Sequence, residues 1–325
     1  MRKTEVGRRR FLKQGGVFAL GAAGVMLPRE GYAQGAVPNS AGTGSPTLKA
    51  PPNACDCHHH IYDAVRFPPP AGSANPIVPN ARVDEYQLLQ RRLHTARSVI
   101  VTPAPYVTDN RVTLDAIARF GPTARGVAVV RPDVTDAELK ALERGGIRGI
   151  RFSLALSQST VSPVTTIDMV EPLSKRVAAL GWHVQINLAA DEIAATEALW
   201  SRLPSPIVFD HIGHIPGPAG TSHPAYAVMR RLVDKGRTWV KLSVTWDNTA
   251  DGPPAYTDVV GLGQAFVKAA PERLVWGSNW PHPSETQKPP DDAVLFDLMA
   301  RWAPDERTRR RILVENPATL YGFGS

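Results

Sequence analysis

The chain has 325 residues, of which 43% are hydrophobic and 21% charged, and its formal net charge is +7. The first 33 residues hold seven basic and two acidic side chains, so the remainder carries a formal charge of only about +2. Because the basic excess belongs largely to this leader, the charge gives no support to nucleic-acid binding. The remaining length is enough for one large core or a barrel.

The N-terminus predicts a targeting segment. Arg8-Arg9-Arg10-Phe11-Leu12-Lys13 has the layout of a twin-arginine signal, and a small, apolar stretch follows from Gly15 to Leu27. Gly31-Tyr32-Ala33 is a small-x-Ala cleavage motif. The apolar run is too short and too glycine-rich for a membrane span. We therefore expect a signal peptide over 1–33, the twin-arginine translocase as an export partner, and a periplasmic protein beginning near Gln34.

Residues 34–53 are rich in Gly, Pro, Ser, Ala and Asn, which predicts a flexible linker before a domain over 54–325. The two cysteines, Cys55 and Cys57, are two positions apart on one expected strand. A disulfide between them would need strained geometry, so we expect buried free thiols.

From residue 54 onwards, short β-branched runs alternate with amphipathic stretches. The expected strands are 54–61, 98–103, 126–130, 147–153, 183–188, 206–212, 238–244 and 274–279. The expected helices are 83–96, 109–120, 135–144, 166–180, 190–202, 223–236, 255–270, 291–302 and 304–313. Thr135-Asp136-Ala137-Glu138 resembles a capping box at the start of one of these helices.

Eight β-α units in about 270 residues predict a single-domain (β/α)₈ TIM barrel in the α/β class, with a doubly wound open sheet as the alternative. No G-x-G-x-x-G motif or P-loop follows any expected strand, so the sequence gives no support to a nucleotide-binding enzyme. The Pro-rich range 67–80 reads as a long loop over the barrel mouth, a candidate lid.

The first strand concentrates groups that bind metals or move protons. Strict alternation places Asp56, His58 and His60 on one face, and Cys55, Cys57 and His59 on the other. Burying three such polar groups together is costly unless they serve a purpose.

Polar residues also end other strands, where a barrel carries its working groups. Singly, Arg151 could cap a helix or pair with an acid, His211 could be a core histidine, and Lys241 could be an ion-pair partner. Their convergence on one mouth predicts an active site instead. The candidates are His58 and His60, Arg151, Gln185 and Asn187, His211, Lys241 and Ser243, and Asn279 and His282.

These motifs resemble those of the amidohydrolase superfamily, and more narrowly its branch containing 2-pyrone-4,6-dicarboxylate lactonase and D-galactarolactone isomerase. The resemblance covers about 53–323 and rests on His-x-His at 58–60, Gly-Ile-Arg-Phe at 149–152, Phe-Asp-His-Ile-Gly at 209–213, Val-Trp-Gly-Ser-Asn-Trp-Pro-His at 275–282 and Glu-Asn-Pro-Ala-Thr-Leu-Tyr at 315–321. It implies a distorted barrel acting on a small anionic substrate, a carboxylated lactone or similar ester. His58, His60 and His211 would polarise its carbonyl, and Arg151 would hold its carboxylate.

Two departures from the branch's pattern bear on the reaction. Asn279 stands where hydrolytic members carry a water-activating Asp, and the isomerase branch also has Asn there. Val244-Thr245-Trp246-Asp247 replaces a frequent Gly-Ala-Tyr-Arg, which questions a dicarboxylate substrate. We expect lactone hydrolysis first and lactone isomerisation second. A non-catalytic barrel that binds a small anion is a third possibility.

His58, His60 and His211 are the residues that would hold a single zinc or manganese ion if one were bound. Asn279 at the usual acid position and Arg151 at the end of the fourth strand argue against it, because neither supplies a ligand. The lactonase branch resembled here generally works without metal, so no cofactor is expected.

Overall fold

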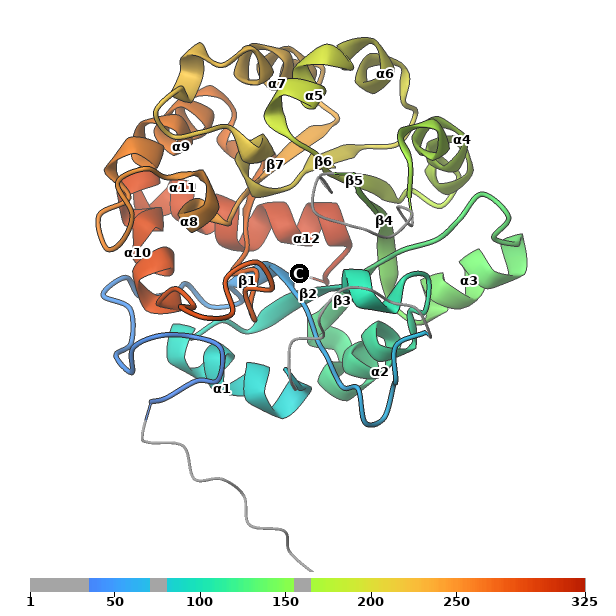
Figure 1. Cartoon of the computed structure of the whole chain (residues 1–325), viewed down its shortest axis with the longest axis horizontal. Helices are drawn as coiled ribbons and strands as arrows, with labels where there is room; N and C mark the ends of the chain where they lie inside the picture. Colours follow the sequence, from blue (N-terminus) through green and yellow to red (C-terminus); the bar gives the residue numbers. More distant parts are fainter. Residues whose placement is uncertain (1–34, 71–80, 155–164, 325) are drawn as a thin grey trace, which may run out of the picture. The chain divides into compact units, whose positions relative to one another are not determined.

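The computed structural model describes residues 35–70, 81–154 and 165–324. Its core is one parallel sheet of eight strands that pair in sequence order and curve into a nearly closed barrel (Figure 1). The strands are β1 Cys55–His59, β2 Arg97–Val101, β3 Ala124–Ala128, β4 Ile147–Ser153, β5 His183–Asn187, β6 Ile207–Phe209, β7 Thr238–Leu242 and β8 Leu274–Trp276. Each expected strand is present, and the predicted (β/α)₈ barrel is confirmed.

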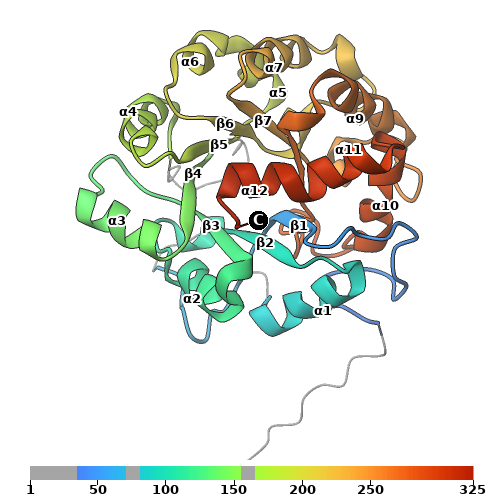
Figure 2. The ribbon, with the colours of Figure 1, turned by 180° about the vertical axis from the view of Figure 1, so that it is seen from behind.

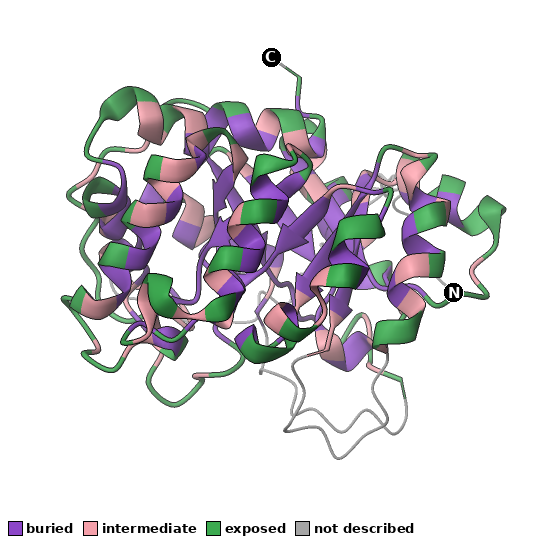
Figure 3. Ribbon diagram, turned by 90° about the horizontal axis from the view of Figure 1, so that it is seen from above, coloured by how far each residue is buried: buried purple, intermediate pink, exposed green. Residues whose placement is uncertain are grey.

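Helices surround the barrel, with buried faces turned towards the strands and exposed faces outward (Figure 3). They are α1 Val83–Leu93, α2 Arg111–Phe120, α3 Asp136–Arg144, α4 Ile167–Ala178, α5 Ala190–Ala195, α6 Glu197–Arg202, α7 Pro224–Asp234, α8 Thr245–Asn248, α9 Thr257–Ala269, α10 Asp292–Trp302, α11 Glu306–Arg310 and α12 Asn316–Tyr321. The Thr135 capping box opens α3 as predicted: Glu138 N–H donates to Thr135 Oγ1, and Thr135 N–H donates to Glu138 Oε2.

Three helical features differ from the prediction. The range 190–202 contains two helices because Thr196 leaves the helical conformation between them. Helix α11 is short and continues into a π-helical turn, Arg311–Glu315. The one-turn helix α8 follows β7 in a segment too short for a periodic pattern.

The face assignment of the first strand is wrong for Asp56 and for the cysteines. Cys55 and Cys57 pack with valines of the neighbouring strands inside the barrel, whereas Asp56 and His59 both contact Tyr86 of α1. The pairing of β1 with β2 shifts register between Asp56 and His59. This irregularity adds a residue, so that His58 and His60 also face the barrel interior, and simple alternation fails.

The barrel is closed between its last and first strands by hydrogen bonds that do not belong to a strand ladder. Within the described residues β8 shares no strand ladder with β1, and specific groups bridge this seam instead. Asn279 N–H donates to His58 O at 2.7 Å, and His60 N–H donates to Trp280 O at 2.8 Å. The Asp56 carboxylate accepts from Ser278 Oγ at 2.6 Å and Ser278 N at 3.0 Å. A Cβ on Gly277 would lie 2.6 Å from His58 Cβ, so only glycine permits this approach.

Residues 35–53 differ from the flexible linker that the sequence predicts. Arg92 of α1 is buried and donates to Gly44 O and Ala41 O, and it pairs with Asp291. Trp280 Nε1 donates to Pro38 O at 2.7 Å. We call residues 37–48 the strap, because they hold α1, the loop after β8 and α10 together.

The opposite end of the barrel is covered by α12 and the C-terminal residues (Figure 2). Arg97 donates to Gly324 O and Arg125 donates to Gly322 O, and both guanidinium groups lie over the Phe323 ring. The expected signal peptide and most of the expected lid lie outside the described residues. Within the described part of the chain, no helix is long and apolar enough to cross a membrane.

Candidate active site

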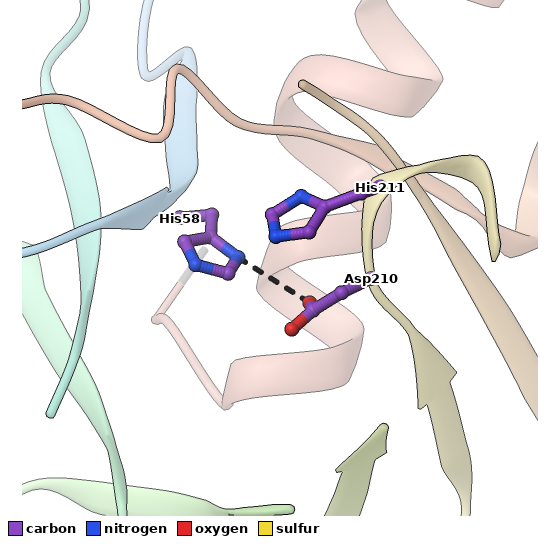
Figure 4. A group of neighbouring side chains, drawn as sticks. All are labelled: His58, Asp210 and His211. Carbon is purple, nitrogen blue, oxygen red and sulfur yellow. Dashed lines mark ion pairs between the residues drawn. The ribbon is translucent and has the colours of Figure 1, made fainter. Parts of the chain in front are cut away.

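Asp210 is the centre of the polar cluster at the barrel mouth. It directly follows β6, is fully buried, and faces His58 of β1 and its own neighbour His211 (Figure 4). Its Oδ2 accepts from Arg151 Nε and Gln185 Nε2, both at 3.0 Å. Burial opposes its ionisation, but the charges of Lys241 and Arg151 and the contact with His58 outweigh burial and hold the pKa of Asp210 well below its usual range.

Lys241 and Gln185 form a supporting layer with their polar atoms already in use. Lys241 Nζ donates to Gln185 Oε1 at 2.7 Å and lies 3.5 Å from Asp210 Oδ1 and 3.3 Å from His58 Nδ1. Burial lowers the pKa of Lys241, and Asp210 opposes this shift. Both residues are thus fully buried, with Lys241 next to His58. Their predicted substrate contact stays a prediction.

The hydrogen-bond partners of His58 and His60 indicate which ring nitrogen of each residue carries the proton. His60 Nδ1 lies 2.8 Å from Val101 O, which can only accept, so Nδ1 carries the proton. Burial, together with Arg151, lowers the pKa of His60 to about 3, so the ring is neutral and its Nε2 is an acceptor. That atom lies 3.2 Å from His58 Nε2, which therefore donates. His58 Nδ1 then accepts from Lys241 Nζ, and it also lies 3.3 Å from Asp210 Oδ1.

His211 has no such fixed proton. Its Nδ1 lies 2.9 Å from Ser243 Oγ, a hydroxyl that donates or accepts equally well. Its ring is 4.9 Å from that of His58, and burial holds the pKa of His211 well below the usual value. His211 can therefore present either a proton or a lone pair at Nε2.

A strained turn aims His211 and a histidine that the sequence reasoning missed, His214. All four residues of the turn His211–His214 have positive φ, between 50° and 65°. A Cβ on Gly213 would lie 2.5 Å from Met229 Sδ, so the turn requires glycine there. His214 Nε2 lies 2.6 Å from Asn187 Oδ1, and Asn187 Nδ2 donates to Ser153 Oγ at 3.0 Å.

Several polar groups of the candidate residues have no hydrogen-bond partner among the described residues. They include the terminal guanidinium nitrogens of Arg151, Nε2 of His211 and the side-chain amide of Asn279. His282, also predicted at the site, is bound away from the other histidines: its Nε2 lies 3.1 Å from Asp292 Oδ2, and its ring packs edge-to-face on Trp246. The structure thus gathers the predicted residues at one barrel end, with His282 at the margin.

Sequence reasoning missed Asp210, Ser278 and Asp292 as well as His214. Asp210 lies inside the Phe-Asp-His-Ile-Gly motif, but reading the strand end selected only the neighbouring histidine. The signal that would have found it is the number of cationic strand ends, Arg151 and Lys241, which need a buried carboxylate nearby.

His58, Asp210 and His211 bring ligand atoms within 4.8 Å of one another, which is the spacing of a metal site. The chemistry of this set fits a resident divalent ion poorly. His58 and His60 use their ring nitrogens on each other, on Lys241 and on Val101. Asp210 already faces one ammonium and one guanidinium, so a dication would add to buried positive charge with no second carboxylate.

The mouth of this parallel barrel carries His-x-His on β1, a buried Asp-His pair after β6 and a polar loop after β8. These features together define a class of hydrolase-like barrel enzymes. The chain matches the amidohydrolase family over residues 55–323, and it belongs to that family.

Three relatives and one solved structure are similar to this chain over most of its length. The chain is 32% identical to 4-sulfomuconolactone hydrolase of Rhizobium radiobacter, over 84% of this chain and 91% of the relative. It is 31% identical to 2-pyrone-4,6-dicarboxylate hydrolase of Comamonas testosteroni (86% and 94%) and 30% identical to D-galactarolactone isomerase of Agrobacterium fabrum (85% and 94%). An apo crystal structure from Agrobacterium tumefaciens superimposes with a TM-score of 0.78 at 28% identity, covering 86% of this chain and 99% of that one.

Proposed function

We propose that this protein is an enzyme that hydrolyses a carboxylated lactone. The observation that carries the proposal is the neutral His58–His60 pair beside His211, held over the Asp210–Lys241 ion pair. Two similar proteins named lactone hydrolases support this class of reaction, and one named lactone isomerase supports the cyclic ester as the substrate.

We assign a role in this reaction to each group. The His58 Nε2–H turns from His60 to the lactone carbonyl, where it and His211 stabilise the developing oxyanion. This exchange frees the lone pair of His60 Nε2, which takes a proton from the attacking water. The Asn279 amide orients that water. The ring C–O bond then breaks, and the same proton passes to the leaving oxygen. Arg151 holds the substrate carboxylate through its terminal nitrogens.

Lactone isomerisation is the second candidate, because Asn279 is a neutral amide and cannot take a proton from water. A hydroxyl of the substrate would then attack in place of water, with the same histidines serving the carbonyl. The two reactions differ in their proton balance. Hydrolysis at neutral pH releases one proton per lactone as the new carboxylic acid ionises, whereas isomerisation releases none.

Proton release during turnover of a panel of sugar-acid and muconolactone-type lactones tests the proposal. We expect acid release matching the loss of lactone, abolished in His58→Ala. Conversion without acid release would assign isomerisation, and saturable binding without conversion would assign the non-catalytic barrel. Asn279→Asp should raise hydrolysis by about tenfold or more. Asn279→Gly, which suits the positive φ at this position, is the matched control without a carboxylate.

We also propose that the enzyme works without a resident metal, as the donor chemistry above supports. Elemental analysis of the purified protein should find less than stoichiometric zinc and manganese, and chelator treatment should leave activity unchanged. One equivalent of metal that disappears in His58→Ala would overturn this part of the proposal.

For location, we propose export to the periplasm by the twin-arginine route, on the basis of the motif at Arg8–Lys13. Replacing Arg8 and Arg9 together by lysine should retain the protein in the cytoplasm, which fractionation would detect.

A further inference from the structure

We propose that Asp56 is a positioning residue, whose carboxylate sets the separation between His58 on β1 and Asn279 after β8. This role rests on the proposed lactone hydrolysis, in which His58 serves the carbonyl and Asn279 orients the attacking water. It goes beyond that function because Asp56 acts only through these two residues and contacts neither the substrate nor the reacting atoms.

The Asp56 carboxylate makes all of its hydrogen bonds within the protein. Its Oδ1 accepts from two backbone amides, those of His58 and Ser278, each at 3.0 Å. Its Oδ2 accepts from two hydroxyls, Ser278 Oγ at 2.6 Å and Tyr86 OH at 2.9 Å. Four bonds use the acceptor capacity of a carboxylate, and Asp56 is only 1% exposed. Asp56 therefore has no free oxygen lone pair to offer a substrate.

The two amides on Asp56 Oδ1 come from opposite sides of the seam. One belongs to His58 itself, and the other belongs to Ser278, the residue before Asn279. A direct bond from Asn279 N–H to His58 O, at 2.7 Å, closes the set. A single carboxylate oxygen thus ties His58 to the neighbour of Asn279, and a displacement of either edge of the seam would break one of these bonds.

An irregular strand pairing explains why a side chain holds His58 here. In the β1–β2 pairing, Asp56 is the partner of Ser98 and His59 is the partner of Ile100, with a register shift between them. His58 lies in this interval, and its amide bonds to the Asp56 side chain. On the other side, no strand ladder joins β8 to β1 within the described residues. Since the ladders constrain this part of β1 weakly, Asp56 supplies the missing constraint.

The group proposed to hold the substrate carboxylate lies away from the seam. Arg151 is on β4, in the middle of the sheet order, and its Nε bonds to Asp210 after β6. Loss of the Asp56 bridge should therefore misalign His58 and Asn279 and leave the grip of Arg151 on the substrate intact. Because a misplacement of about 1 Å can cost about 10²-fold in rate, the effect should fall on kcat and spare KM.

Two substitutions of Asp56 separate position from charge. Asp56→Asn keeps an oxygen for the two amides and removes the charge, whereas Asp56→Glu keeps the charge and displaces the oxygens. We expect Asp56→Asn to retain kcat within about threefold. Asp56→Glu should lose about 10²-fold in kcat, with KM changed by less than about threefold. Steady-state kinetics measures both, with each rate corrected for the folded fraction found by urea unfolding.

Tyr86→Phe is the matched control for a merely structural effect. It removes one hydroxyl from Asp56 Oδ2 and keeps the aromatic ring, and it leaves both amide bonds across the seam in place. We expect it to lower stability and retain kcat. If Asp56→Glu does not fold, Asp56→Ser takes its place, because its short side chain cannot bridge the two amides.

Nuclear magnetic resonance of the ligand-free protein reports on the same role without turnover. The His58 Nε2 proton, bonded to His60, should give a downfield imidazole signal. Asp56→Asn and Tyr86→Phe should keep its position, and Asp56→Glu should shift or broaden it. If no lactone is turned over, the proposed function fails, while this signal still tests the role of Asp56. An unchanged His58 signal in folded Asp56→Glu, or an equal loss of kcat in Asp56→Asn and Asp56→Glu, overturns the inference.

Discussion

Asp210 shows how much one buried charge can organise. It neutralises Arg151 and lies beside Lys241, and it fixes the side of His58 from which the ammonium approaches. Because a carboxylate with two cationic neighbours is stable in a dry interior only as a set, each member constrains the others. His58 therefore owes part of its orientation to Asp210 and Lys241, which are both fully buried.

The substitution Asp210→Asn should strongly reduce both stability and activity. The change leaves Arg151 and Lys241 buried without their counter-charge, so we expect a loss of about 3–5 kcal/mol in unfolding free energy. Activity should fall by about 10²-fold or more, because Lys241 loses the carboxylate that holds it beside His58 Nδ1. Urea unfolding and steady-state kinetics would measure both. Asp234→Asn, at an exposed acid on α7, is the control. Near-native stability in Asp210→Asn would contradict the role of Asp210 as the centre of the polar cluster.

Among the elements, the strap connects the N-terminal segment to the site. It contacts the loop after β8 and the start of α10: Pro38 O accepts from the Trp280 indole, and Ser40 Oγ accepts from Asp292 N–H. Asp292 in turn binds His282. The strap thus holds the loop that carries Asn279, although its own sequence contains no catalytic candidate.

Arg92→Met should detach the strap while keeping α1 apolar contacts. Arg92 is nearly fully buried and makes several bonds to the strap, so we expect a loss of about 2–4 kcal/mol in stability. Cleavage by a protease within 37–48 should accelerate, which mass spectrometry of the fragments would locate. Arg91→Met, at an exposed position on the same helix, is the matched control, and unchanged proteolysis would contradict the role of Arg92.

The sequence predicts the barrel well because eight β-branched runs and their helices repeat along the chain. It also predicts His58, His60, His211 and Arg151, since polar residues at strand ends are conspicuous. It fails where local rules give way to tertiary contacts. The irregular β1–β2 pairing moves Asp56 off the predicted face, and the strap is ordered by Arg92, which lies far along the chain. Composition alone describes neither effect.

For the whole molecule, the decisive feature is the seam between β8 and β1. Asp56 bridges it, and burial raises the pKa of this carboxyl from 3.8 to about 6, against the lowering effect of its bonds from Ser278. The folded state thus binds this proton more tightly than the unfolded chain does. From this group alone, unfolding free energy rises as the pH falls from above 6 to below 4.

Ser278→Ala should weaken the seam in a pH-dependent way. At pH 8 the ionised Asp56 loses a hydroxyl donor, so we expect a loss of about 1–3 kcal/mol in unfolding free energy. At pH 5 Asp56 is largely protonated in the folded state, and the loss should be smaller. Urea unfolding at both pH values measures the difference. Ser205→Ala, buried and bonded to a backbone carbonyl, should show no such pH dependence.

The seam has a consequence for how ligands act on the enzyme. His58 lies on one edge of the seam and Asn279 on the other, joined only by isolated bonds instead of a ladder. A substrate analogue that contacts both residues links the first strand to the last. By thermodynamic linkage, its binding energy adds to the cohesion of the whole barrel, so melting temperature becomes a direct readout of site occupancy.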